Sequence, residues 1–324
     1  MAQSYGRPTS IESAETPGRI DLGGIWVRSA RRVRDYLAIA REKPSWLPMF
    51  VLARFLLTRR IYRRLALARS GAAVTAAGDT AFPDIDLAAA KEQIRRDGII
   101  TGLTLPPATL AEILEFSRST PCYGDSSTNA PILPAEFAAV AREGRYIIAD
   151  YRDGIGDCAA IRQLWTDPVL TGMARHYLGT TPHLLRSRLW WSFVTPQAAP
   201  EARAGFSQEF HFDLDDWLCW KFFFYLTDTT EQDGAHQFVR DSHRRRPLSL
   251  QFSPFKGVSE AWTRATYPAE DIMTLTGPAG FGFGEDSYGI HRGTAPRRSP
   301  RLILEIEFGC SRQPVAGRYG APET

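Results

Sequence analysis

Residues 209–225 are EFHFDLDDWLCWKFFFY. Their second half contains the pattern that decides the fold, and their first half contains a candidate metal site. The second half of this stretch is a short aromatic run, which is typical of a buried β-strand. Similar runs bounded by turn residues recur from residue 183 onward: HLLRSRLWWSFVT, HQFVRD, DIMTLTG, GFGFGEDS and RLILEIEFGC. Together with EFHFDLDDW and LCWKFFFYLTD they make seven predicted strands, which favour an all-β sandwich or barrel.

The residues before 183 have the period of helices instead. We expect helices over residues 86–96 and 160–178, the second of them ending at Gly179. The Gly/Ala-rich stretch 70–80 is expected to be a linker, and residues 121–135 a long loop of the kind that covers a site. Helices therefore precede a β core along the chain.

Residues 25–70 form a basic segment with twelve lysines and arginines against two acids. Apolar residues recur in it at helical spacing, and Pro44 and Pro48 are expected to separate two helices. Two interpretations stay open. The helices support the core domain with a solvated basic face, or they dock an anionic partner such as a lipid headgroup, a membrane surface or an acidic carrier protein. Its longest apolar run is too short for the roughly 20 residues of a membrane span.

The composition places the chain among ordinary globular proteins. Its 324 residues predict one core domain with extra elements, which we divide into residues 1–78, a partly disordered N-terminus plus the basic helical extension, and residues 79–324. A net charge of +3 gives no argument for a nucleic-acid partner. The four cysteines form no C-x-x-C pair, and the first ten residues do not read as a secretion signal. We therefore expect a cytoplasmic protein.

His211 and Asp213 are the first candidate metal ligands. Residues two apart in a strand point to the same face, so these two side chains can converge on one point. His291 follows 80 residues later, in GIHRG at the end of another predicted strand. Two imidazoles and one carboxylate on one face of an octahedron leave three positions open, which suits non-haem Fe(II). An isolated H-x-D triplet is more often a surface turn or a His–Asp hydrogen bond.

Arg301 adds a second feature to this pattern. It opens a predicted strand ten residues after His291, where its guanidinium can bind a carboxylate with two hydrogen bonds. On the strand before the candidate ligands, Arg188, Trp190 and Ser192 alternate, so they share one face and are expected to line a cavity.

Several segments together resemble the phytanoyl-CoA dioxygenase superfamily, which includes ectoine hydroxylase. Residues 211–217, HFDLDDW, resemble its H-x-D-x-x-x-W segment, and residues 233–244, DGAHQFVRDSHR, resemble its N-G-A-L-x-V-x-P-G-S-H-R stretch. Residues 97–100, DGII, look like its opening strand, and residues 166–184 look like its D-P-x-L…Y-L-G helix. The resemblance covers residues 86–310 in the expected order.

This resemblance implies an α+β fold, with a double-stranded β-helix (a cupin-like jelly roll) flanked by helices and extended by the N-terminal ones. It implies an Fe(II)- and 2-oxoglutarate-dependent dioxygenase, with O2 as second co-substrate. His211, Asp213 and His291 match the iron ligands. Arg301 matches the residue that binds the C5 carboxylate of oxoglutarate, Trp217 an aromatic beside oxoglutarate, and Thr294 a hydroxyl that helps to bind the carboxylate.

The departures from the family pattern leave some alternatives open. The spacing from His291 to Arg301 is one residue short, so Arg298 and Arg297 are alternative anchors. Asp213 stands where halogenating relatives have Gly or Ala, which favours hydroxylation of an unactivated C–H bond in a small or carrier-tethered substrate. Desaturation or cyclisation would need only a different substrate position. A rival of another class is an inactive β-helix that acts as a binding module through its basic helices.

Overall fold

The computed structural model of the chain describes residues 40–41, 43–70, 78–125, 130–152, 154–196, 208–253 and 255–311. The chain divides into two compact units, residues 1–42 and 43–324. Only residues 40–41 of the first unit are described, and they are helical. The expected disorder of residues 1–22 and most of the expected linker lie outside the described residues. The predicted boundary after residue 78 stays a prediction, and the basic segment 43–70 belongs to the second compact unit.

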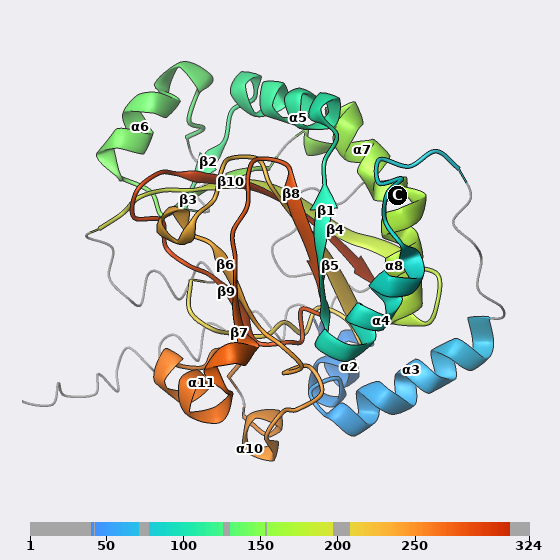
Figure 1. Cartoon of the computed structure of the whole chain (residues 1–324). Helices are drawn as coiled ribbons and strands as arrows, with labels where there is room; N and C mark the ends of the chain where they lie inside the picture. The colour runs from blue at the N-terminus through green and yellow to red at the C-terminus, as the bar shows by residue number, and fades with distance from the viewer. Residues whose placement is uncertain are drawn as a thin grey trace, which may run out of the picture. The chain divides into compact units, whose positions relative to one another are not determined.

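The second unit combines helices with two antiparallel sheets (Figure 1). Its helices are α2 (Trp46–Leu52), α3 (Leu56–Ser70), α4 (Leu87–Asp97), α5 (Pro107–Ser119), α6 (Phe137–Glu143), α7 (Ala159–Thr166), α8 (Pro168–Leu178), α10 (Leu248–Gln251) and α11 (Glu260–Thr266). Its strands are β1 (Ile99–Thr104), β2 (Tyr123–Gly124), β3 (Ile148–Tyr151), β4 (His183–Ser192), β5 (Cys219–Tyr225), β6 (His236–Val239), β7 (Ile272–Leu275), β8 (Phe281–Glu285), β9 (His291–Gly293) and β10 (Arg301–Gly309).

The two sheets form the expected jelly roll. Within the described residues the larger sheet has the strand order β1-β8-β5-β10-β4-β3-β2, and the smaller sheet has the order β7-β6-β9. Several neighbouring strands are far apart in sequence; β10, for example, lies between β4 and β5. The α+β architecture with a double-stranded β-helix core is therefore confirmed.

The central strand β10 separates two environments because its side chains alternate between the faces of the larger sheet. Leu302, Leu304 and Ile306 face the helices and join a core with residues of α4, α5, α7 and α8, which cover that side (Figure 1). On the opposite face, Ile303 joins a smaller cluster with Phe223 of β5, Phe238 of β6 and others between the sheets. The site described below lies on this second face.

Two elements differ from the sequence prediction. The segment around His211 is not a regular strand; His211 forms only isolated bridges, one to His291 and one to Gly257. The helix expected over 160–178 is broken into α7 and α8. Pro168 disfavours a helical conformation for the residue before it, and the Asp167 side chain accepts hydrogen bonds from the first turn of α8. Gly179 ends α8 with a φ of 73°, as predicted.

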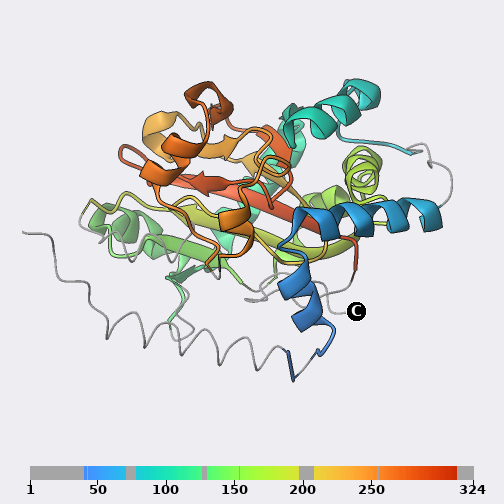
Figure 2. The same cartoon turned by 90° about the horizontal axis from the view of Figure 1, so that it is seen from below.

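Pro44 lies in a turn between the helical residues 40–41 and α2, as predicted, whereas Pro48 acts differently from the prediction. Pro48 does not separate two helices, because it lies in the first turn of α2, where its missing N–H has no helical partner to lose. The chain instead turns between α2 and α3, over residues 53–55 (Figure 2). None of the helices among the described residues is long and apolar enough to cross a bilayer. All four cysteines are buried and free.

Gly98 offers a test of this fold. It ends α4 with a φ of 75°, and a Cβ built there would lie 2.2 Å from Nδ1 of His243. Gly102 also has a positive φ, 91°, but nothing lies within 4 Å of its Cβ position. We expect Gly98→Ala to cost ~2–4 kcal/mol of unfolding free energy, from backbone strain plus the clash. Gly102→Ala should cost only the strain, ~1–2 kcal/mol. Urea unfolding measures both, and equal losses would contradict the contact with His243.

Candidate functional site

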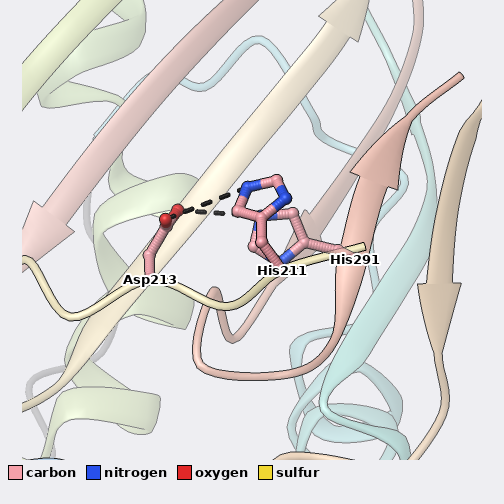
Figure 3. A group of neighbouring side chains, drawn as sticks. All are labelled: His211, Asp213 and His291. Carbon is pink, nitrogen blue, oxygen red and sulfur yellow. Dashed lines mark ion pairs between the residues drawn. The ribbon is translucent and has the colours of Figure 1, made fainter. Parts of the chain in front are cut away.

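The structure brings His211, Asp213 and His291 together (Figure 3). His291 begins β9, and His211 lies beside it through two backbone hydrogen bonds of 2.9 Å, each residue donating its N–H to the other's carbonyl. The backbone N–H of Asp213 donates to the carbonyl of Ser287 at 2.8 Å. One ligand atom from each of the three residues lies within 4.8 Å of the others. The period-two convergence expected from the sequence is thus present, without a regular strand.

The two imidazoles are held with Nε2 toward the carboxylate. Nδ1 of His211 lies 2.8 Å from the carbonyl of Glu209, and Nδ1 of His291 lies 2.9 Å from the carbonyl of Gly289. A carbonyl only accepts, so each Nδ1 carries the hydrogen and each Nε2 keeps its lone pair. The two Nε2 atoms lie 3.9 and 3.6 Å from Asp213 oxygens. Burial lowers the pKa of both rings, that of His291 to about 4, so both are neutral at neutral pH.

This donor set fits a divalent transition metal. Neutral imidazole nitrogens and a carboxylate that share one face are the ligands of mononuclear non-haem Fe(II). The carbonyl that fixes each Nδ1 is the usual support of a ligating histidine. The carboxyl of Asp213 is ionised. Burial alone would raise the pKa of this carboxyl, but Lys221 and the two histidines lower that pKa well below its ordinary value.

Lys221 is the main charged neighbour of this centre. Lys221 lies on the mostly aromatic strand β5. Its Nζ donates a hydrogen bond to Oδ2 of Asp213 at a distance of 2.7 Å. Lys221, Glu307 and Arg186 lie opposite one another on β5, β10 and β4. Arg186 also binds Glu305 at 2.8 Å. Burial raises the pKa of Glu307 to about 8, while Lys221 and Arg186 oppose this rise. The inner face of the larger sheet thus carries a buried charge network beside the three candidate ligands.

A pocket of about 200 Å³ opens on this centre. His211, Asp213 and His291 line one part of it. Arg188, Trp190 and Ser192 of β4 line another part, as their alternation predicted. Phe281 and Phe283 are not pocket walls; they pack in the core between the sheets.

Arg301 also lines the pocket and lacks an anionic partner. Its guanidinium is buried and donates to the carbonyl of Gly234 and, at 3.2 Å, to Oγ of Ser192. Nε has no hydrogen-bond partner, and no described residue forms an ion pair with this side chain. Gly293 packs closely against it, since a Cβ there would lie 3.2 Å from Nη2. A buried cation without a counter-charge is costly, so the pocket is suited to a carboxylate from a ligand.

The two alternative anchors are engaged or exposed. Arg298 binds Asp233 through two hydrogen bonds of 3.1 and 2.7 Å at the surface. Arg297 is exposed. Neither of them lines the pocket.

Trp217 and Thr294 are not brought to the pocket. The ring of Trp217 stacks on Tyr62 of α3 with centroids 5.1 Å apart. The backbone N–H of Trp217 donates to Oδ1 of Asp216 at 2.7 Å, and its ring packs on α3, which is remote in sequence. The hydroxyl of Thr294 donates to the carbonyl of Ala235 at 2.8 Å. Ser192, on the other side of Arg301, supplies the hydroxyl that Thr294 was expected to supply.

Sequence reasoning missed several residues of the pocket, above all Lys221, Glu305 and His236. A lysine in the middle of an aromatic strand was a usable signal for the first, because isolated charges in buried strands need a partner. His236 lies 2.9 Å from Glu285 and its ring stacks near that of His291. No pattern in the sequence singled out this histidine from an ordinary strand position.

Comparison with known proteins agrees with this geometry. Residues 138–280 match the family model of phytanoyl-CoA dioxygenase (PhyH). Over this stretch the chain is similar to the phytanoyl-CoA dioxygenase family, and the candidate ligands His211 and Asp213 lie within it. The matched stretch ends before His291 and Arg301, so the case for these two comes from the geometry. No curated protein matches the chain.

Solved structures share the fold at low sequence identity. The α-ketoglutarate-dependent epimerase SnoN from nogalamycin biosynthesis is 18% identical, with a TM-score of 0.50 over 74% of this chain and 95% of SnoN. EctD from S. alaskensis, solved with bound Fe, is 15% identical, with a TM-score of 0.47 over 79% and 87%. HygX from Streptomyces hygroscopicus, solved with nickel and 2-oxoglutarate, is 12% identical, with a TM-score of 0.46 over 67% and 85%.

The metal centre can be tested with Co(II) as a spectroscopic probe. We expect Asp213→Ala to weaken Co(II) binding by more than the roughly 10- to 100-fold that is typical of residues that only support a ligand. His176→Gln is the matched control, because His176 lies on α8 outside the pocket. Unchanged Co(II) affinity in Asp213→Ala would rule out the site.

Proposed function

We propose that this PhyH-like protein is an Fe(II)- and 2-oxoglutarate-dependent dioxygenase that hydroxylates an unactivated C–H bond of a small organic or carrier-tethered substrate. The observation that carries the proposal is a single pocket with two complementary parts. One part has two neutral imidazoles and a carboxylate, and the other has a buried arginine with no ionic partner among the described residues. Oxoglutarate has the two ends that these parts require, a metal-chelating keto acid and a distant carboxylate.

Each residue of the pocket then has a role. His211, Asp213 and His291 would hold the iron, and Arg301 with Ser192 would bind the C5 carboxylate of oxoglutarate. Iron with oxoglutarate supplies the activation of O2: oxoglutarate, O2 and the substrate C–H give succinate, CO2 and the alcohol. The protein contributes the ligand geometry, a pocket with limited access for water, and the position of the substrate.

Lys221 supports the geometry of the iron site in this proposal. Because its ammonium binds Oδ2 of Asp213, Oδ1 is the oxygen left to face a metal. The presence of a carboxylate at residue 213 supports hydroxylation over halogenation, which needs this position to be open. An inactive binding module would have no use for a buried arginine without a partner beside an intact ligand set.

Arg301 gives the sharpest test of oxoglutarate binding. We expect Arg301→Gln to raise the KM for oxoglutarate about 10- to 100-fold in uncoupled succinate formation, because it removes charged hydrogen bonds in a buried pocket. Arg298→Gln is the control and should stay within about twofold, since Arg298 lies outside the pocket, where its exposed guanidinium pairs with the buried carboxylate of Asp233. A larger effect for Arg298→Gln than for Arg301→Gln would transfer the role to Arg298.

Isotope labelling tests the reaction type. Compounds would first be screened for stimulation of succinate formation in the intact enzyme. With a compound that stimulates it, turnover under ¹⁸O2 should give a product that gains one labelled oxygen atom. A product without label would contradict hydroxylation and indicate desaturation, cyclisation or epimerisation. Absence of succinate formation with Fe(II) and oxoglutarate, with and without added compounds, would contradict the enzyme proposal itself.

A further inference from the structure

The basic helices present an unusual apolar surface. Among the described residues, the large apolar side chains that are exposed gather around α2, α3 and α10, with Leu133 as the exception. They are Leu47, Val51 and Leu52 on α2, Leu57, Ile61, Leu65 and Leu67 on α3, and Leu248, Phe252 and Phe255 on and after α10. The turn between α2 and α3 contacts the end of α10, since the ring of Phe55 lies 5.1 Å from that of Phe252 and the N–H of Leu56 donates to Oε1 of Gln251 at 3.0 Å. Exposed apolar residues that gather in this way mark an interaction site.

Helix α3 is fixed to the domain through its other face. Arg59 is buried and binds Asp286 at 3.3 Å and the carbonyl of Trp217 at 2.9 Å. Tyr62 stacks on Trp217. The contacts of Arg59 and Tyr62 therefore hold α3 in a defined orientation on the domain (Figure 2). The face of α3 with the exposed apolar residues is its outer face.

Arginines interleave with the apolar residues on this exposed face. Leu57, Arg60, Ile61, Arg64 and Leu65 follow one another at the spacing of a single helical stripe, and all five are exposed. Residues 43–70 contain seven lysines and arginines and no acid. Arg60 and Arg64 form no ion pair with any described residue. The arginines of this face thus lack an ionic partner, and its apolar side chains are uncovered, in the described part of the chain.

A basic pocket of about 140 Å³ borders the stripe, between α3 and α4. Five arginines line it: Arg59, Arg60, Arg63, Arg95 and Arg244. Among the described residues its only acidic lining residue is Asp286, which binds Arg59, while Arg95 and Arg244 pair with Glu92 and Asp241 outside the lining. Nε of Arg63 is buried without a hydrogen-bond partner. Such a pocket complements a phosphate group.

We propose that the face of α2 and α3 docks on an anionic phospholipid membrane. Leucine and isoleucine side chains would enter the interface, and the arginines would bind phosphates, with one headgroup phosphate in the pocket beside α3. A helix that lies in a membrane interface combines apolar side chains that enter the interface with basic side chains that bind lipid phosphates. A protein interface would instead be enriched in aromatic residues, and the exposed large apolar residues of α2 and α3 are all aliphatic. This inference does not depend on the proposed oxygenase reaction.

Vesicle sedimentation of the full-length chain tests the proposal. We expect binding to phosphatidylcholine vesicles that contain phosphatidylglycerol, weak binding to pure phosphatidylcholine, and a large loss of binding between ~0.1 and ~0.5 M NaCl. Arg60→Glu/Arg64→Glu should reduce binding at least about 25-fold, at about fivefold for each basic residue lost. Leu57→Ser/Ile61→Ser/Leu65→Ser should reduce it at least about tenfold.

Matched controls separate this face from general charge and from catalysis. Arg118→Glu/Arg142→Glu makes the same charge change at exposed positions of α5 and α6 and should keep binding within about twofold. His291→Ala should bind vesicles normally, because the metal centre is not part of the docking face. Inorganic phosphate should compete only weakly if the bilayer supplies the phosphate.

Three outcomes would overturn the proposal. One is absence of binding to anionic vesicles by the full chain. Another is equal loss of binding in the Arg118→Glu/Arg142→Glu control, which would reduce the effect to net charge. The third is full displacement by millimolar inorganic phosphate, which would assign the pocket to a soluble phosphate ligand.

Discussion

The reciprocal backbone pair between His211 and His291 is the contact on which the site depends. These residues are 80 positions apart, and neither lies within a long strand. Two hydrogen bonds of 2.9 Å hold their backbones in register, and local carbonyls then fix each ring. Asp213 follows at the period-two position and completes the group. The rest of the jelly roll holds these two short segments opposite one another.

The larger sheet supports the site in a different way. Its outer face is apolar and packs on the helices, so the sheet itself is firmly buried. Its inner face can therefore carry groups that are costly to bury, among them Lys221, Glu305 and Arg301. The first two are stabilised by cross-strand charges, whereas Arg301 has only neutral acceptors among the described residues. This difference between paired and unpaired charge distinguishes a structural network from a binding site.

The sequence was sufficient to predict much of this arrangement. Period-two spacing predicted that His211 and Asp213 converge, and that Arg188, Trp190 and Ser192 share a face, because both follow from strand geometry alone. It did not predict the interruption at Asp167 and Pro168, where capping outweighs the helical apolar pattern. Trp217 was expected beside oxoglutarate, but its direction depends on the hydrogen bond to Asp216 and on Tyr62, which is remote in sequence. Lys221 was missed for the same reason: its partners come from other strands.

The crossing of the segments at residues 211 and 291 has a thermodynamic consequence. A metal bound to all three side chains would act as a cross-link that closes a loop of 80 residues, formed only in the folded chain. Ligand binding to the native state alone raises its stability by mass action, by about 2.7 kcal/mol at a free metal concentration 100 times the Kd. Metal supply would in this way change the stability of the folded protein as well as its chemistry.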